Sequence, residues 1–487
     1  MQTDRLARPS ARPSILALSS ILALSSIPAF GLLLAVLPAA AACGSVDDDD
    51  GGGGDDAADG SDDGVASDAP TYYRDVYPIL QSRCAGCHRD GEIAPFAIDE
   101  DPATAQAFAP AMAQAAADRI MPPFLPGPDS PALREDMRLA DDEIATLSAW
   151  SEAGAPLGDP ADKVAVLPPA GFPLDQPDLA FDIGVDYTPD ATLNDDYRCF
   201  AVPIDVASPR MSIGYRITPG NPQVVHHVIV SLVSADDAQA LADLDAETPD
   251  QPGWPCFGGS LPQGSGIRQV GRIGAWTPGQ DGRLTYPGTA VPVPPGVVAV
   301  VQVHYNTLNG VAPDRTSVEV FYAQEATQAE LLPLGGVGTV SRDIEIPAGD
   351  DEVVVSATHT IAEWRRVRGG DSDGAIDDEA WAVGAAAHGH LIMSRHRLTL
   401  NAGTPDERIL LDIPRWNFNW QGQWLYQTPI LVHGSDTLTI ECTYDNSPEH
   451  RAAVGLDAQS QTVTWGEGTT DEMCMGSVAL VAEQPPE

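Results

Sequence analysis

Basic residues are scarce in this chain of 487 residues: Lys and Arg number 26 against 70 Asp and Glu, and the formal net charge is -44. Phosphate recognition depends on a basic surface, so the shortage argues against nucleic acid as a partner. Hydrophobic residues still make up 43% of the chain, which is enough for two or three globular cores.

A clean membrane-spanning run is missing at the N-terminus, because serines and prolines interrupt the apolar stretch that follows three arginines. Basic residues before a short apolar segment are typical of a secretory signal peptide, and a transmembrane anchor is the alternative. Small residues before Cys43 resemble a bacterial lipobox, so residues 1–42 predict a lipoprotein signal peptide and Cys43 the lipidated first residue of the mature protein. Residues 43–70 are too rich in Asp and Gly to bury a core, and they predict an acidic linker. We therefore expect an exported lipoprotein of the bacterial cell envelope, on the periplasmic side or at the outer membrane, which meets the membrane through its lipid anchor only.

Cysteines are also few, and each of the seven can be assigned to a lipid anchor, a close pair or a disulfide. One takes the lipid and Cys84 and Cys87 form a close pair, which leaves an even number that suggests two disulfides in an exported protein. Four cysteines allow three pairings, and each bond would stabilise by about 3 to 4 kcal/mol on the loop-closure model. The pairing that keeps each bond inside one domain joins Cys199 to Cys256 and Cys442 to Cys474.

The segment TYYRDVYPILQSRCAGCHRD predicts a helix that ends in the motif CAGCH. Cys-x-x-Cys-His is the attachment signature of c-type haem, with Cys84 and Cys87 forming the thioethers and His88 binding the iron. A second ligand pair suited to zinc is missing nearby, and so is the βαβ context of a thioredoxin-like site. The motif therefore predicts a covalent haem c.

A further iron ligand is expected after an alanine-rich helix, where Met121 lies on a proline-stiffened turn in DRIMPPF. A thioether at this position would raise the reduction potential. Met112 competes, but a methionine in mid-helix between alanines is typical of a core. A last helix, capped by Asp141 or Asp142, completes residues 71–157, which resemble the small bacterial cytochrome c domains.

Long helical periodicity is missing from about residue 165 onward, where short valine-rich strands alternate with Pro, Gly, Asn and Asp. This pattern is typical of all-β sandwiches, and the length suits two of them. We expect the boundary near LLPLGGVG, which gives domains of 165–332 and 333–487. The predicted fold class is multidomain, with a small all-α cytochrome c-like domain followed by two all-β sandwiches.

Two adjacent histidines, His226 and His227, lie inside the apolar strand NPQVVHHVIVSLVS. Neighbouring side chains point to opposite faces of a regular strand, so both can bind one metal only at a bulge or a strand end. His304 ends a second valine-rich strand, VVAVVQVHYN, with Gln302 on the same face. These three imidazoles could meet across neighbouring strands, and by themselves they suit zinc as well as copper.

The second half of the β region favours copper. His388 and His390 in AAAHGHLIM are two residues apart and so share one face of a strand, and the glycine between them leaves room on the other face. Met473 in TTDEMCMGSV lies beside a cysteine whose disulfide would hold it in place. Soft sulfur stabilises Cu(I), whereas zinc gains little from it. Met475 and Met393 are competing thioethers, and both also suit a core.

In this order, HHVIV, VQVHYN, HGHLIM and TTDEMC, with YRCF before them, resemble the copper type II, ascorbate-dependent monooxygenases, the family of peptidylglycine α-hydroxylating and dopamine β-monooxygenases. The resemblance covers about residues 175–483. It implies two jelly-roll domains that face each other across a solvent-filled cleft, each with one copper. It also implies an electron-transfer copper held by His226, His227 and His304, and a catalytic, oxygen-binding copper held by His388, His390 and Met473.

Other positions refine the resemblance. Tyr197 and Gln302 match positions near the first copper. The arginine that grips the substrate carboxylate in the peptide-amidating enzyme is replaced by Ala386, so peptidylglycine is not the expected substrate. The stretch IPRWNFNWQ is similar to the bacterial members, and its alternating aromatic residues suit either an apolar pocket or a sheet core: Trp416, Phe418 and Trp420.

These features together predict a copper-dependent monooxygenase that hydroxylates a C–H bond of a small organic substrate with O₂. The expected cofactors are two copper ions, a haem c, and ascorbate or another one-electron donor, which includes an electron-donor protein. The haem either relays electrons to the first copper or serves a separate partner. The alternatives are a copper- and haem-binding electron-transfer lipoprotein without oxygenase activity, and a purely structural surface protein. Surface or core positions are expected for the other histidines, His359, His396, His433 and His450.

Overall fold

The computed structural model describes residues 69–89, 94, 96–98, 101–164, 174–256, 259–262, 264–278, 280, 282–307, 310–362 and 379–486. The predicted signal peptide, the lipidation site Cys43 and nearly all of the acidic linker lie outside these residues. In the part of the chain that is described, no helix is long and apolar enough to cross a membrane.

The first helical stretch runs from Tyr72 to Cys84. Within it, α1 (Tyr77–Ile79) lies between two π-helical segments, Tyr72–Val76 and Leu80–Cys84. The apolar face expected from the sequence is confirmed, because its four members are all buried: Tyr72, Val76, Ile79 and Leu80.

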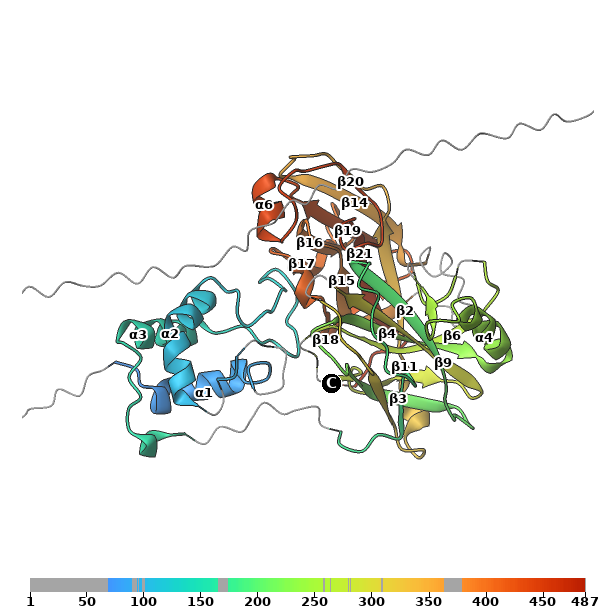
Figure 1. Cartoon of the computed structure of the whole chain (residues 1–487), viewed down its shortest axis with the longest axis horizontal. Coiled ribbons are helices and arrows are strands. Elements are labelled where there is room, and N and C mark those ends of the chain that lie inside the picture. Colours follow the sequence, from blue (N-terminus) through green and yellow to red (C-terminus); the bar gives the residue numbers. More distant parts are fainter. Residues whose placement is uncertain are drawn as a thin grey trace, which may run out of the picture. The chain divides into compact units, whose positions relative to one another are not determined.

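Two longer helices, α2 (Pro102–Ala117) and α3 (Asp141–Glu152), share a small core with this stretch (Figure 1). The buried side chains of α2 are all alanines, which remove little apolar surface from water. The helix α3 begins after Ala140, whose N–H donates to Glu143 Oε2 at 2.8 Å. Neither aspartate expected to cap α3 is the residue that precedes it, so that detail of the sequence analysis was wrong.

The middle of the connection between α2 and α3 packs into the second β region, whereas Leu139 near its end stays in the small helical core. Five prolines fall between positions 122 and 131, and proline cannot continue a helix because it lacks the N–H and clashes with the preceding turn. Gly127 N donates to Asp412 O at 2.7 Å. Leu133 forms a β-bridge with Tyr426 and is 2% exposed in the core of the second β region.

The predicted fold class is therefore wrong. The described chain is mostly β-sheet with few helices, and a separate all-α cytochrome c-like domain does not form. Ser67–Glu487 is one compact unit, in which Phe124, Leu125 and Leu133 of the segment between α2 and α3 pack into a β core. Apolar residues in a proline-rich loop have no periodicity, so the sequence does not indicate which core they enter.

The first β region contains β1 (Leu179–Asp182), β2 (Asp195–Pro203), β3 (Arg210–Thr218), β4 (Val225–Ser234), β5 (Trp254–Pro255), β6 (Gln269–Trp276), β7 (Arg283–Leu284), β8 (Thr289–Val293), β9 (Val297–Asn306), β10 (Ser317–Tyr322) and β11 (Leu332–Pro333). One sheet has the order β1-β10-β3-β8-β11, with β7 paired to β3, and the other has the order β5-β2-β9-β4-β6. The two sheets share one apolar core, to which β4 and β9 contribute alternating valines. A short helix, α4 (Ala238–Ala246), follows β4.

The second β region contains β12 (Gly335–Ser341), β13 (Glu345–Ile346), β14 (Val353–Thr360), β15 (Glu379–His388), β16 (Met393–Leu400), β17 (Arg408–Ile413), β18 (Gln423–His433), β19 (Thr437–Tyr444), β20 (Val463–Thr464) and β21 (Cys474–Val481), with the helix α6 (Pro448–Ala453). The sheets β12-β21-β15-β18 and β14-β19-β16-β17 share a core, and β13 pairs with β20. The chain passes between the regions at Leu334, because β11 pairs with β8 and β12 pairs with β21. These sheets, coloured green to red in Figure 1, replace the two jelly rolls that the resemblance implied.

Both predicted disulfides are confirmed. Cys199 bonds to Cys256 within the first β region, and Cys442 bonds to Cys474 within the second. Each bond joins neighbouring elements of one region, as the choice among the three pairings required.

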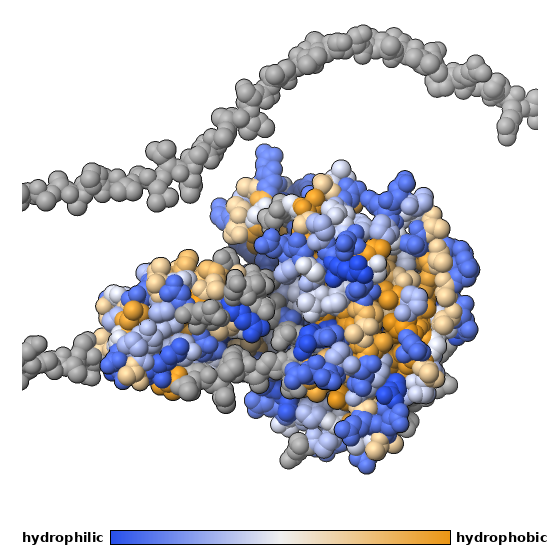
Figure 2. Space-filling view, turned by 60° about the horizontal axis from the view of Figure 1, so that its bottom comes forward, coloured by the Kyte–Doolittle hydropathy of each residue, from blue (hydrophilic) through white to orange (hydrophobic). Residues whose placement is uncertain are grey.

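The surface and the interior differ in where they place polar groups. Figure 2 shows hydrophilic residues over much of one face, interspersed with apolar areas. Inside, the shared cores are apolar, but several buried titratable side chains gather near one end of β4, β9 and β15, among them His226, His304, His390 and Glu472.

Replacing Leu133 by alanine tests whether the middle of the connection between α2 and α3 belongs to the β core. We expect the variant to lower the free energy of unfolding by about 2 to 5 kcal/mol, because the lost side chain leaves a cavity among buried neighbours. Met137→Ala is the control, since Met137 is 43% exposed and its loss should change the free energy by less than about 0.5 kcal/mol. Chemical denaturation followed by intrinsic fluorescence makes the comparison. Equal midpoints for the two variants would contradict this placement.

Candidate metal centre

The first set of histidines lies where β4 and β9 pair. In the register, His227 faces His304 and Val225 faces Tyr305, so His226 is an extra residue in a bulge near the beginning of β4. A bulge or strand end is the condition under which adjacent histidines can turn to one side. The bulge expected from the sequence is therefore confirmed, and it lies near the beginning of the strand.

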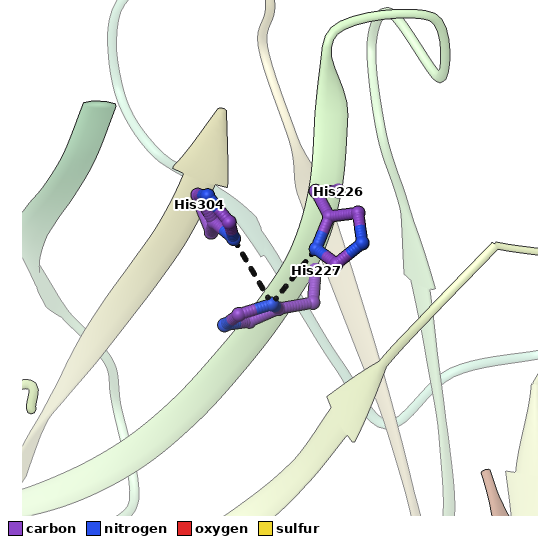
Figure 3. Close-up of side chains that lie close together, drawn as sticks. All are labelled: His226, His227 and His304. Atoms are coloured by element: carbon purple, nitrogen blue, oxygen red, sulfur yellow. Dashed lines mark hydrogen bonds between the residues drawn. The ribbon is translucent and has the colours of Figure 1, made fainter. Parts of the chain in front are cut away.

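The Nδ1 atoms of the three rings converge. His227 Nδ1 lies 3.3 Å from His226 Nδ1 and 3.3 Å from His304 Nδ1. Figure 3 shows the three rings turned towards one another. Two imidazole nitrogens bound to one tetrahedral ion at about 2.0 to 2.1 Å would themselves be roughly 3.3 to 3.4 Å apart. His226, His227 and His304 therefore have the spacing of a three-nitrogen metal site.

Burial keeps these imidazoles neutral. It lowers the pKa of His226 and His227 well below the ordinary value, and the nearby His304 lowers both further. The pKa of His304 is also lowered by burial, although Asp195 opposes the shift. A neutral imidazole keeps the lone pair that a metal needs, so the site is in the protonation state for binding.

Asp195 orients His304. Its carboxylate accepts a hydrogen bond from His304 Nε2 at 2.9 Å, which directs the Nδ1 lone pair towards the other two rings. Burial alone would raise the pKa of Asp195, but hydrogen bonds from His304 and Thr469 outweigh burial and hold the pKa below its ordinary value. Tyr197, two residues further along β2, stacks on the His304 ring with centroids 3.9 Å apart.

Gln302 does not contact the first set of histidines. Its amide donates to Cys256 O at 3.0 Å, so it supports the Cys199–Cys256 disulfide. Of the two positions that the resemblance placed near the first copper, Tyr197 is beside the histidines and Gln302 is not.

The second pair of histidines, His388 and His390, is held through hydrogen bonds at the Nδ1 atoms. His388 Nδ1 is hydrogen bonded to Gln421 Oε1, and His390 Nδ1 is 3.1 Å from Asp471 O. Because these acceptors fix the N–H on Nδ1, the Nε2 lone pairs are available to a metal. Burial lowers the pKa of His388 to about 4 and that of His390 to about 3.

The turn between these histidines requires glycine. The strand β15 ends at His388, so His390 lies just beyond the strand on which the sequence analysis placed it. A Cβ atom added to Gly389 would lie 2.0 Å from Met393 Cε and 3.0 Å from Met473 O. The glycine thus makes room for Met393, which is buried in the core, and brings Met473 against the turn.

Two methionines, Met473 and Met475, stand next to the backbone of the second pair. Met473 is buried directly before Cys474, and its carbonyl accepts a hydrogen bond from Tyr444 OH at 2.8 Å. Met475 is the residue opposite His388 in the β15–β21 ladder, and directly opposed residues project from the same face. Both methionines therefore stay candidates for a ligand.

Glu472 holds the backbone around the second pair. Its fully buried carboxylate accepts hydrogen bonds from the N–H groups of His390, Ile392, Met393 and Met473, at 2.7 to 3.2 Å. Burial raises its pKa to about 8, although the four N–H donors oppose the shift. Sequence reasoning missed Glu472, Asp195 and Gln421. The signals present were that Glu472 precedes Met473 in TTDEMC and that Gln421 ends the stretch IPRWNFNWQ.

The two sets of histidines lie next to each other. The rings of His227 and His388 have centroids 6.4 Å apart. Phe418 stacks on His226 at 4.3 Å and meets His390 edge-on at 6.1 Å. The resemblance implied an open, solvent-filled cleft between the two sets, but in this structure the sets meet through aromatic rings.

The aromatic residues of IPRWNFNWQ divide between two surroundings. Phe418 lies among the histidines, whereas Trp416 and Trp420 line a cavity of about 710 Å³. Trp416 Nε1 also donates to His390 O at 3.0 Å. Both interpretations of this stretch therefore hold in part, because Trp416 faces the cavity and is also buried in the β core.

The CAGCH segment follows the first helical stretch. His88 Nδ1 lies 3.0 Å from Phe96 O, which leaves Nε2 as the nitrogen able to bind a metal. Burial lowers the pKa of His88 and raises the pKa of Cys84 to about 12. The lowered pKa keeps His88 neutral, as a metal ligand must be, and the raised pKa keeps Cys84 a protonated thiol.

The two candidate methionines for the iron occupy different places. Met112 packs against the small helical core, whereas Met121 is 36% exposed and lines the 710 Å³ cavity. Cys84, Cys87 and His88 are not among the residues that line this cavity. The structure therefore favours Met121 over Met112 as an accessible thioether, but it does not bring Met121 and His88 into one described site.

The remaining histidines make structural contacts. His396 is fully buried, with Nε2 3.1 Å from Met475 O, and its ring stacks on Trp416. His433 lies near Glu379 and Asp436, and His450 lies near Asp445. His359 is half-buried on β14. None of these four belongs to the histidine sets.

Comparisons with known proteins add no identification. No family model and no curated protein matches the sequence. PBCV-1 VP54, fitted into a reconstruction of the virophage Sputnik, is 8% identical over 63% of this chain and 94% of its own, with a TM-score of 0.24. A structure of infectious bursal disease virus, Gt strain, is 10% identical over 64% and 81%, with a TM-score of 0.15. At these scores the likeness establishes neither fold nor function.

His396 gives the metal-free protein a measurable dependence on pH. Burial lowers its folded-state pKa to about 4, below the roughly 6.5 of an unfolded histidine. Its contribution to stability is complete above about pH 6.5 and is lost as pH falls towards 4, because the unfolded chain then binds the extra proton.

We expect His396→Leu to reduce the loss of stability between pH 7 and pH 5 by about 2 kcal/mol relative to the wild type. Leu398→Ala, at a buried residue of the same strand that carries no titratable group, should leave that loss unchanged. Urea denaturation at both pH values in the presence of a chelator measures the difference. An unchanged pH dependence in the leucine variant would show that folding does not lower the pKa of His396.

Proposed function

We propose that the protein is a copper-dependent monooxygenase that hydroxylates a C–H bond of a small organic substrate. The reaction consumes O₂, two electrons and two protons, inserts one oxygen atom into the substrate and releases the other as water. The observation that carries the proposal is the convergence of three Nδ1 atoms at 3.3 Å beside a second histidine pair.

The donor set fits copper better than zinc. Zinc is satisfied by imidazoles alone, whereas a thioether adds preference for Cu(I). The backbone of Met473 lies against the Gly389 turn and Met475 stands opposite His388, so either methionine could supply the thioether. Bound copper would supply one-electron redox chemistry and a site for O₂.

The roles of the residues follow the resemblance. His226, His227 and His304 would hold the copper that stores and transfers an electron. His388, His390 and a methionine, Met473 in the first place, would hold the copper where O₂ reacts. Asp195, Gln421 and the carbonyl of Asp471 orient the rings, and Phe418 excludes water between the two sets.

A covalent haem c is the proposed source or store of electrons. Cys84 and Cys87 would form its thioethers and His88 would bind the iron, and the hydrogen bond from His88 Nδ1 to Phe96 O supports this orientation. Met121 is the proposed second ligand. Ascorbate or an electron-donor protein would supply the electrons from outside.

The proposed location is the bacterial cell envelope, with the lipid on Cys43. Two disulfides point to an oxidising compartment, which agrees with export. No role for nucleic acid is proposed, since the chain has few basic residues.

A copper- and haem-binding electron-transfer protein is the second candidate. The burial of His304 and His390, at 1% and 2% exposure, favours it, because a substrate must reach a copper that hydroxylates it. The two candidates differ in one measurement: an oxygenase consumes O₂ in proportion to hydroxylated product, whereas an electron-transfer protein only cycles between redox states.

Oxygen uptake with product analysis tests the function. Copper-loaded protein with ascorbate is screened against phenethylamine-like, acylglycine-like and lipid-derived compounds, and we expect one class to give product in step with O₂ consumed. Met473→His should retain two coppers but lose turnover by at least about tenfold, because an all-imidazole site no longer favours Cu(I).

Met475→Leu is the matched control for the histidine variant. It should bind two coppers and turn over like the wild type if Met473 is the ligand. Full activity in Met473→His together with loss in Met475→Leu would reassign the ligand to Met475. Zinc in place of copper after purification, with no activity on adding copper, would end the proposal.

Replacing Cys84 and Cys87 by alanine tests the role of the haem. The double variant should still bind both coppers and should turn over with excess ascorbate. Turnover driven by a one-electron protein donor should fall to background if the haem relays electrons. In the wild type, stopped-flow absorbance should show haem oxidation when O₂ and substrate are added. Haem that stays reduced while product forms would show that the haem serves another partner.

A further inference from the structure

Asp195 contacts a candidate ligand and the opposite β region at once. On one side its carboxylate accepts the hydrogen bond from His304 Nε2, 2.9 Å away, within the first β region. On the other side it accepts hydrogen bonds from Thr469 N, 3.1 Å away, and from Thr469 Oγ1. Thr469 is 3% exposed and lies between β20 and β21, four residues before Met473.

Tyr197 makes a parallel connection from the same strand. Its ring stacks on His304, and its hydroxyl donates to Glu467 O at 3.3 Å. Residues at i and i+2 of a strand share one face, so Asp195 and Tyr197 both reach the segment 466–472 from one side of β2. This segment also contains Asp471, whose carbonyl faces His390 Nδ1.

We propose that Asp195 is a positioning residue that couples the two candidate metal sites. It keeps the His304 proton on Nε2, so that the Nδ1 lone pair faces His227. It also holds the segment that leads to Met473 in place for the second site. The identity of the metal rests on the function proposed above, whereas the coupling rests on these hydrogen bonds alone.

The coupling requires a carboxylate. Both neighbours of Asp195 are donors, His304 Nε2–H and the N–H and hydroxyl of Thr469, and a carboxylate can accept from both sides. An amide has one oxygen and one NH₂ group. If the oxygen faces Thr469 N, the NH₂ group faces His304 Nε2 and favours a proton on Nδ1, where it blocks the metal. If the oxygen faces His304, two donors meet at Thr469.

Two variants, Asp195→Asn and Thr469→Val, separate the contact of Asp195 with His304 from its contact with Thr469. The asparagine variant should disturb both halves. The valine variant loses only the hydroxyl contact and leaves the pair of Asp195 and His304 intact. Asp186→Asn is the control, because it removes an equal charge from an exposed ion pair with Arg315.

Amide hydrogen exchange of residues 466–472 in the metal-free protein is the first measurement. We expect exchange to accelerate at least about tenfold in Asp195→Asn, less in Thr469→Val and not at all in Asp186→Asn. The copper titration and Cu(II) spectrum of the first site are the second measurement. The first-site affinity should fall by about 10- to 100-fold in Asp195→Asn only.

Two outcomes would overturn the proposal. Exchange in Asp195→Asn equal to that in Asp186→Asn would show that Asp195 does not hold the segment. An equal loss of first-site copper in Thr469→Val and Asp195→Asn would show that the effect does not pass through the His304 proton. If Asp195→Asn fails to fold, Thr469→Val still tests the exchange. Failure of the wild type to bind copper would reject the proposed function but not the coupling, which exchange measures without metal.

Discussion

The burial of five neutral imidazoles in one region is the constraint on which the rest of the site depends. A neutral ring carries one N–H and one lone pair, and a buried polar atom without a partner costs free energy. For three of the five rings the acceptor is a side chain or a carbonyl outside the strands: Asp195, Gln421 and the carbonyl of Asp471. These oxygens fix the tautomers of His304, His388 and His390, whereas His226 Nε2 is buried without a hydrogen-bond partner. The Nδ1 atoms of His226 and His304 both face His227 Nδ1, where a metal ion could replace the ring-to-ring contacts.

The same constraint explains why the histidines lie where regular pairing stops. His226 is the extra residue of a bulge, and His388 is the last residue of β15, with His390 beyond it. A regular strand fixes each side chain to one of two faces, whereas a bulge or an end lets neighbouring rings turn together. Gly389 allows the second turn to lie against Met393 and Met473. The bulge in β4 and the end of β15 thus let the two sets of rings come together.

The sequence predicts features that have a period or a spacing. The buried face of the first helix, the two disulfides and the bulge at His226 all follow from such patterns. Asp195, Gln421 and Glu472 carry no pattern, because each acts across a distance in sequence that only the fold closes. The fold class failed for a related reason. Leu133 belongs to a proline-rich segment whose apolar residues enter a β core, and nothing in their order distinguishes that core from a helical one.

The loop that contains Trp416 and Phe418 shows how the two chemical motifs come near each other. Arg415, at its start, donates to the carbonyls of Asp118 and Arg119, just before Met121. Trp416 lines the same cavity as Met121 and donates to the His390 carbonyl, so one indole ring separates the cavity from the second pair of histidines. These two hydrogen bonds hold the C-terminal end of α2 against the loop, and Met121 follows directly at the cavity. The second pair of histidines, and not the first set, is therefore the one that this indole connects to the cavity.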